Sequence, residues 1–236
     1  MMIRVLLAAI LAGLLAGAFA TVAQSARVIP LILEAETYEN AGVPDHGHEP
    51  ATVAHDHEDE AWAPEDGLQR TFFTLLSNLV VGASFALLLT AAIMLLNQPI
   101  SMRSGLLWGA GGFGAFVLAP NFGLPPELPG MPAGDLLERQ IWWTATVAMT
   151  AGGLLMLALK RRLPWMLAGV ALIVLPHIYG APQAVSHDSD VPANLAAQFA
   201  TASVVTSALF WLVLGGLLGA FLARAVKQED FAGNHA

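Results

Sequence analysis

Six long apolar runs constrain the fold of this chain more than any other feature. They cover about residues 5–26, 72–96, 104–119, 141–159, 163–179 and 197–222. A run of about 20 apolar residues can cross the hydrocarbon core of a bilayer as a helix, which pairs its backbone N–H and C=O groups within the segment. We therefore predict an all-α, polytopic membrane helix bundle that forms a single membrane domain.

Composition supports this class and limits the available chemistry. Only 12% of the 236 residues are charged, against about 25% in a typical soluble domain. The chain contains no cysteine, which excludes disulfides, thiolate metal sites and thiol catalysis. Imidazole, carboxylate, thioether and carbonyl groups are left as possible metal ligands.

Three of the six runs have an alternative interpretation in which they do not cross the membrane as ordinary spans. The first run could be a cleaved signal peptide, because Ala18, Phe19 and Ala20 imitate a small-x-small cleavage site. Its apolar core, however, is longer than the roughly 7 to 15 residues of a signal peptide. The third and fifth runs are short for a full crossing and could be tilted, broken or re-entrant helices. After Pro30, residues 31–39 could continue the first helix beyond the membrane.

Charged residues divide between the two sides of this topology. With six spans and a cytoplasmic N-terminus, seven of the ten basic residues fall on one side: Arg4, Arg103, Lys160, Arg161, Arg162, Arg224 and Lys227. The positive-inside rule places that side in the cytoplasm. Sixteen of the eighteen acidic residues fall on the other side. We predict an inner-membrane protein with both termini in the cytoplasm and an outer face that attracts cations.

An outer loop, residues 40–70, concentrates possible metal ligands. It holds two His-x-His pairs, His46 with His48 and His55 with His57, interleaved with carboxylates. In an extended chain, side chains at i and i+2 project to the same side, and neutral imidazole suits Co, Ni, Cu and Zn. The pattern predicts transient capture of a divalent metal that weakens as histidines protonate below a pKa of about 6.5. The alternative is a solvated acidic loop that binds nothing specific.

Three further residues are candidate ligands closer to the bundle. Glu34 and Glu36 lie just beyond the first run, and His177 ends the fifth. An ionisable residue at membrane depth is by default a functional candidate. Alternatively, the two glutamates are part of a solvated helix face, and His177 lies at the membrane interface and hydrogen-bonds a carbonyl group.

Small residues recur at four-residue spacing within the apolar runs. Gly13 and Gly17, and Gly215 and Gly219, are such pairs, and Gly105 with the glycines at 109–114 forms a longer set. This spacing is typical of closely packed membrane helices. The 109–114 stretch also matches the spacing of a dinucleotide fingerprint, but no strand precedes it, so we expect no cofactor there.

Motifs of other function classes are missing from the sequence. There is no Walker-type phosphate-binding motif, no Ser-His-Asp or H-E-x-x-H arrangement, and the basic stretch at 160–162 is too short for a nucleic-acid patch. We expect no enzymatic activity, no resident cofactor and no nucleic-acid partner.

Four motifs in a fixed order resemble those of a known family. They comprise Glu34, Glu36 and Tyr38; Trp62, Pro64, Gly67 and Arg70; the 126–130 segment with Arg139, Gln140, Trp142 and Trp143; and Pro176, His177, Gly180, Ala181 and Pro182. Together they resemble the CbtA family of predicted cobalt transporter subunits. The resemblance implies cobalt uptake linked to cobalamin synthesis, with CbtB, a small single-span histidine-bearing subunit, as partner. The family is usually described with five spans, whereas the charge pattern favours six.

The sequence therefore predicts a membrane subunit that takes up a divalent metal, cobalt above all. The outer loop captures the ion and the helix bundle passes it inward. The competing interpretation is a non-transporting membrane protein that senses metal or buffers it for a separate permease.

Overall fold

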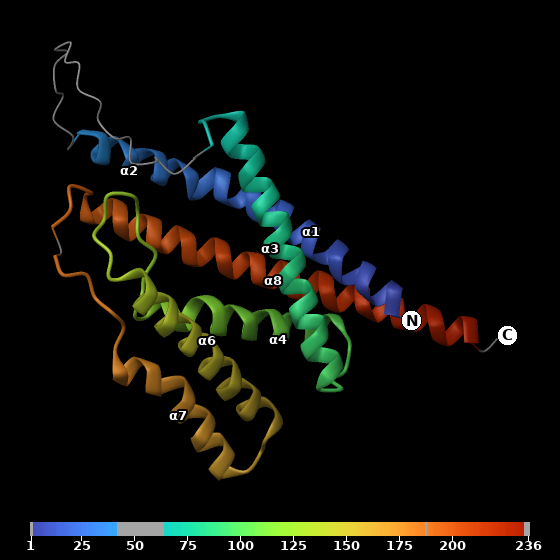
Figure 1. Ribbon diagram of the computed structural model, residues 1–236. Helices are drawn as coiled ribbons and strands as arrows, with labels where there is room; N and C mark the ends of the chain where they lie inside the picture. Colours follow the sequence, from blue (N-terminus) through green and yellow to red (C-terminus); the bar gives the residue numbers. More distant parts are fainter. Residues whose placement is uncertain (1, 42–63, 187, 234–236) are drawn as a thin grey trace.

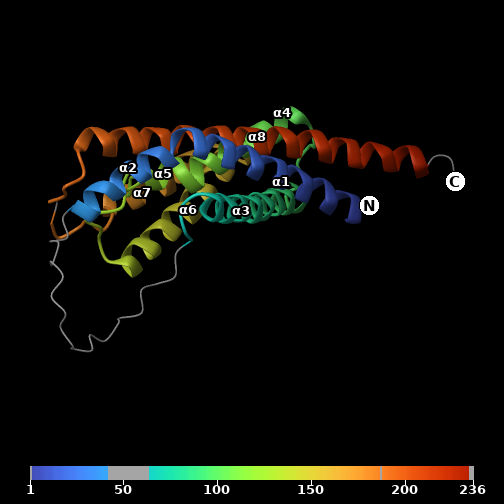
Figure 2. The same cartoon turned by 90° about the horizontal axis from the view of Figure 1, so that it is seen from above.

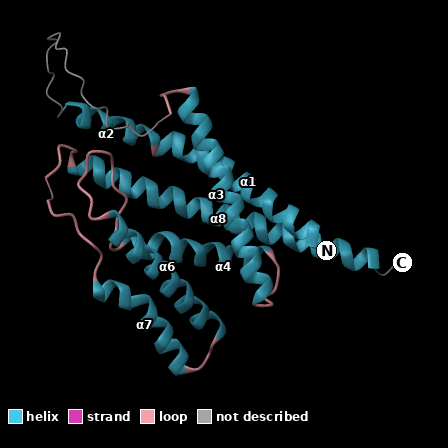
Figure 3. Cartoon of the chain, viewed as in Figure 1, coloured by secondary structure: helices cyan, strands magenta, loops and turns pink. Residues whose placement is uncertain are grey.

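The computed structural model describes residues 2–41, 64–186 and 188–233, which form helices and connecting loops without a strand (Figure 3). The helical elements are α1 (Met2–Arg27), α2 (Ile29–Ala41), α3 (Leu68–Leu95), α4 (Met102–Phe113), the π-helical turn η1 (Gly114–Leu118), α5 (Ala119–Asn121), α6 (Leu136–Leu159), α7 (Leu163–Tyr179) and α8 (Ala193–Gly233). The prediction of an all-helical chain is confirmed for these residues.

Each of the six apolar runs is helical. Four helices are long and apolar enough to cross a membrane: α1, α3, α6 and the 193–227 part of α8. Helix α7 is apolar but has only 17 residues, and the third run is divided among α4, η1 and α5. The prediction of several membrane helices is thus confirmed, and the count of six spans stays a prediction.

The predicted loop over residues 40–70 is helical at both of its ends. Helix α2 continues to Ala41, and α3 begins at Leu68 after Gly67, whose φ of 93° is unfavourable for other residues. Helix α2 is long because it has packing partners: the buried Ala35 joins a cluster with Leu128 and Leu195. Between α1 and α2 the helix is interrupted at Val28, because Pro30 has no N–H to donate.

A π-helical turn interrupts the third run. The N–H of Ala119 donates to the carbonyl oxygen of Gly114, five residues earlier. Pro120, which follows, lacks an N–H and so cannot donate to the previous turn. Such turns lie often at functional sites, and this one borders the pocket described below.

Close glycine contacts hold the helices together in three pairs. A Cβ built at Gly13 would collide with the carbonyl oxygen of Gly82, which joins α1 to α3. Gly105 and Gly215 exclude a side chain at each other's position in the same way between α4 and α8, and Gly153 and Gly169 do so between α6 and α7. Backbones that approach this closely gain packing contacts that lipid cannot replace. The predicted packing role is confirmed for Gly13, Gly17, Gly105, Gly109, Gly112, Gly215 and Gly219, whereas a Cβ at Gly111 would meet no atom within 4 Å.

Trp211 occupies the centre of the main core. Its side chain is 1% exposed and lies against Phe85, Phe116 and Phe210, with ring centroids 4.6, 5.6 and 5.8 Å away. A Cβ at Gly112 would collide with the same indole. The tryptophan of α8 thereby ties α3, α4 and η1 into one unit.

The connections gather at two ends of the bundle (Figures 1 and 2). The N-terminal end of α1, the C-terminal end of α8 and the α3–α4 and α6–α7 connections lie toward one end. Helix α2, the start of α3, and the α5–α6 and α7–α8 connections lie toward the other, which we call the α2 end. Helix α8 has 41 residues, about 60 Å at 1.5 Å per residue, and runs the length of the bundle.

Candidate functional site

The histidines predicted to capture metal lie outside the described residues. His46, His48, His55 and His57 all fall within 42–63. Among the residues that the structure does describe, no group of three or more His, Asp or Glu side chains is placed to hold a metal ion. Glu34, Glu36 and His177 therefore do not form one common site.

Glu36 is held by an arginine that lies 34 residues farther along the chain. Arg70 on α3 pairs with both carboxylate oxygens, at 2.8 Å from Nη2 to Oε1 and 3.3 Å from Nη1 to Oε2. Asp66, four residues earlier in the chain, lies 3.2 Å from Nε of the same arginine. A cation that used Glu36 as a ligand would have to displace Arg70 from it. Glu34 is exposed on the same helix.

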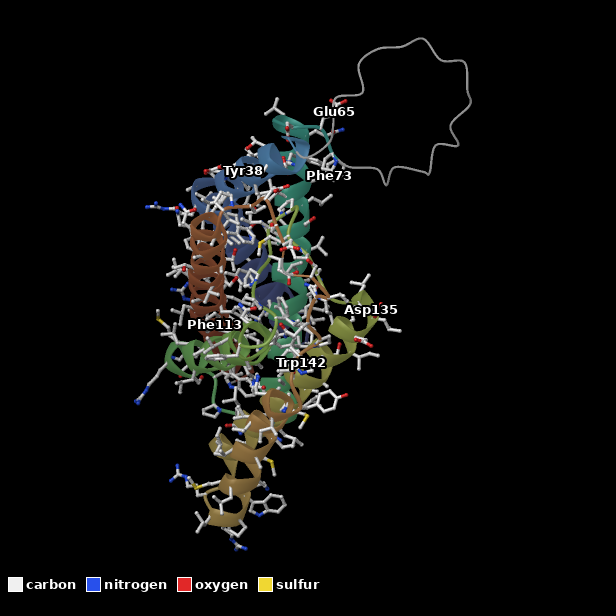
Figure 4. The ribbon with its side chains drawn as sticks, turned by 90° about the vertical axis from the view of Figure 1, so that its left-hand side faces the viewer. Tyr38, Glu65, Phe73, Phe113, Asp135 and Trp142 are labelled. Carbon is white, nitrogen blue, oxygen red and sulfur yellow. The ribbon has the colours of Figure 1, made fainter. Side chains whose placement is uncertain are left out.

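A second ion pair orders the α5–α6 connection. Nη2 of Arg139, in the first turns of α6, lies 2.7 Å from Oε2 of Glu127. The two side chains are 26% and 25% exposed. The Glu36–Arg70 pair joins two of the family-type motifs, and the Glu127–Arg139 pair lies within a single one. Both pairs lie at the α2 end. Figure 4 looks toward this end and labels Tyr38 on α2 and Phe73 on α3.

We predict that the Glu127–Arg139 pair stabilises the fold by more than an exposed pair does. Glu127→Gln leaves a partly buried guanidinium without its charge partner, which should cost about 2 kcal/mol in the free energy of unfolding. Asp66→Asn is the matched control: Asp66 is 72% exposed, so its loss should cost less than about 0.5 kcal/mol. Denaturant unfolding of the purified protein in micelles measures both, and equal losses would contradict the prediction.

His177 lines an open pocket between η1, α5, α6 and α7. The imidazole makes edge-to-face contacts with Trp142 and Phe122, at centroid distances of 5.8 and 6.2 Å. Nε1 of Trp142 donates to the carbonyl oxygen of Pro176, 3.2 Å away. The pocket has a volume of about 880 Å³ and extends from Gln183 past His177 to Thr150 and Leu154. Trp142, on its wall, is labelled in Figure 4.

Thr150 is the functional candidate that the sequence did not reveal. Its side chain is 3% exposed, and its hydroxyl has no hydrogen-bond partner among the described residues. Thr90 and Thr146, which are equally buried, donate to the carbonyl group four residues earlier. A threonine in an apolar helix does not by itself indicate a functional site, because its hydroxyl usually donates to a carbonyl group of its own helix.

Comparison with known protein families gives a match that covers nearly the whole chain. The profile of CbtA, described as "Probable cobalt transporter subunit (CbtA)", matches residues 2–223. This chain belongs to the CbtA family. Membership agrees with the resemblance of the four motifs, and the family description makes the chain a probable cobalt transporter subunit. No curated protein and no solved structure matches the chain.

In a CbtA-family protein, the two ion pairs affect how much negative charge is left at the α2 end. The chain is a probable subunit of a cobalt transporter, and its described carboxylates at the α2 end are partly neutralised by Arg70 and Arg139. Exposed acidic residues such as Glu34 remain available there to attract a cation.

Proposed function

We propose that the chain is the membrane subunit through which Co²⁺ is captured on the outer face of the inner membrane and passed inward. The family match over residues 2–223 carries this proposal. In it, all six apolar runs cross the bilayer, the basic end faces the cytoplasm, and both termini lie there. The α2 end faces outward, so its acidic residues meet the cation before it crosses.

Capture begins at the outer loop in this proposal. His46, His48, His55 and His57 supply neutral nitrogen ligands, and the interleaved carboxylates offset the charge of the ion. Glu34 attracts the ion at the mouth of the bundle, Glu36 becomes a ligand when Arg70 releases it, and His177 receives the ion within the helices. A small single-span subunit of the CbtB type completes the transporter.

We expect the four loop histidines to set the response to scarce cobalt. Replacing all four by alanine should lower uptake of radioactive cobalt into proteoliposomes several-fold at limiting concentrations, and little at plentiful ones. The reason is that capture raises the local ion concentration without altering the path through the bundle. His235→Ala, at the opposite end of the proposed topology, is the control and should leave uptake unchanged. An unchanged concentration dependence in the fourfold variant would remove the capture role.

The same assay separates transport from metal sensing or buffering. Proteoliposomes with this chain alone, and then with the small single-span partner, should accumulate cobalt in at least one of the two preparations. Accumulation in neither, together with intact cobalt binding, would instead support a non-transporting membrane protein.

A further inference from the structure

The pocket beside His177 has the lining of a binding site and is open at the side of the bundle, where Phe122 and Val174 are 78% and 43% exposed. Most of its wall is apolar, from Leu118 on η1, Leu154 on α6 and Ile173 on α7. Three polar side chains line it at different heights: Gln183, His177 and Thr150. A mostly apolar cavity with a few convergent polar groups is the usual form of a small-ligand site.

The register of α6 against α7 orders these groups along the pocket. Trp142 bonds the carbonyl of Pro176 near the α2 end, and Gly153 contacts Gly169 farther along the two helices. Because the helices are antiparallel, Thr150 lies deeper between them than His177. Gln183 follows α7 and lies at the α2 end. The pocket thus extends inward from the outer mouth assigned in the proposed function.

The hydroxyl of Thr150 carries the inference. A buried hydroxyl without a partner costs about 1–3 kcal/mol, and Thr150 forgoes the hydrogen bond that Thr146 makes in the previous turn. The oxygen itself has almost no accessible surface, so a ligand in the pocket satisfies it once the side chain turns toward the pocket that Thr150 lines. The rings of Trp142 and Phe122 contact the imidazole of His177 at the pocket wall.

We propose that this pocket is a transit site for a hydrated divalent cation, with His177 as a direct ligand and Thr150 bonded to a water of the hydration shell. The cargo assignment rests on the proposed function. None of the described residues lining the pocket is acidic, so the ion keeps most of its water and binds weakly, as a site of passage requires. An imidazole ligand favours Co²⁺, Ni²⁺ and Zn²⁺ over Mg²⁺.

Equilibrium binding of radioactive cobalt tests the site in the full chain with the four loop histidines replaced by alanine. This protein should still bind Co²⁺ weakly, with competition from Zn²⁺ but none from Mg²⁺. Adding His177→Gln should lower the affinity about tenfold or more, and adding Thr150→Val about threefold to tenfold. Thr90→Val is the matched control, because Thr90 is buried in α3 and bonded to Ala86, and it should not change the affinity.

Unfolding without cobalt separates a ligand role from a structural one. Thr150→Val should leave the protein equally stable or more stable, because valine has nearly the same shape and removes an unsatisfied hydroxyl. Loss of stability in Thr150→Val, unchanged binding in His177→Gln, or no cobalt binding in the fourfold background would each overturn the site. Failure of the loop histidines to affect uptake would count against the proposed capture step and leave this pocket standing.

Discussion

Gly109→Leu is expected to leave no correctly folded protein. A Cβ at Gly109 would collide with the carbonyl oxygen of Trp211 and lie 3.1 Å from the Cα of Gly215. These are backbone atoms, so neither can turn aside, and α4 would have to separate from α8. Separation exposes Gly105 and Gly219 along the same contact and withdraws the support of Trp211. We expect a loss of more than about 4 kcal/mol, which is diagnostic for a single substitution.

Gly111→Leu is the matched control on the same helix. No atom lies within 4 Å of a Cβ built at Gly111, so leucine there points into open space and improves helix propensity by up to about 1 kcal/mol. Size-exclusion chromatography and thermal unfolding in micelles compare the two variants. A folded Gly109→Leu protein of normal stability would show that α4 and α8 do not meet in this way.

Trp211→Ala is expected to produce the second-largest effect. The substitution empties the space between Phe85, Phe116 and Phe210 and should lower the free energy of unfolding by about 3–5 kcal/mol, the range for an aromatic residue replaced by alanine in a core. Because Trp211 also contacts η1 through Phe116, we expect the π-helical turn to lose its support. The pocket bordered by Gly114 and Leu118 should deform with it.

Two controls define this result. Trp211→Phe keeps an aromatic ring and should recover a large part of the loss. Trp165→Ala, on α7, removes a tryptophan that is 48% exposed and should cost under about 1 kcal/mol. Unfolding in micelles, followed by circular dichroism, measures all three. Equal losses for Trp211→Ala and Trp165→Ala would contradict the central position of Trp211.

The helices were predictable from sequence because apolar length decides membrane helices almost alone. Glycine spacing also predicted close packing at Gly13, Gly105 and Gly215. Which helix each glycine meets was not predictable, because small residues fit many partners equally well. The extension of α2 to Ala41 depends on contacts of Ala35 with Leu128 and Leu195, which are distant in sequence.

The candidate site was predictable only in part. Sequence marked Glu36 and His177 as candidate ligands, but it did not reveal that Arg70 holds Glu36 from 34 residues away. A signal existed: Arg70 and Arg139 are two of only three basic residues on the acidic side, where charge pairing is favoured. Thr150 gave no such signal, because its missing hydrogen bond exists only in three dimensions.

The lengths of α7 and α8 have a consequence for the surrounding lipid. Helix α7 has 17 residues, about 26 Å at 1.5 Å per residue, which is less than the roughly 30 Å of an average hydrocarbon core. Helix α8, with 41 residues, is long enough to cross even when it is strongly tilted. If both cross, α7 is too short for the hydrocarbon core, and the bilayer thins around the hairpin that carries His177. A change in membrane thickness would therefore act on the α6–α7 side of the protein.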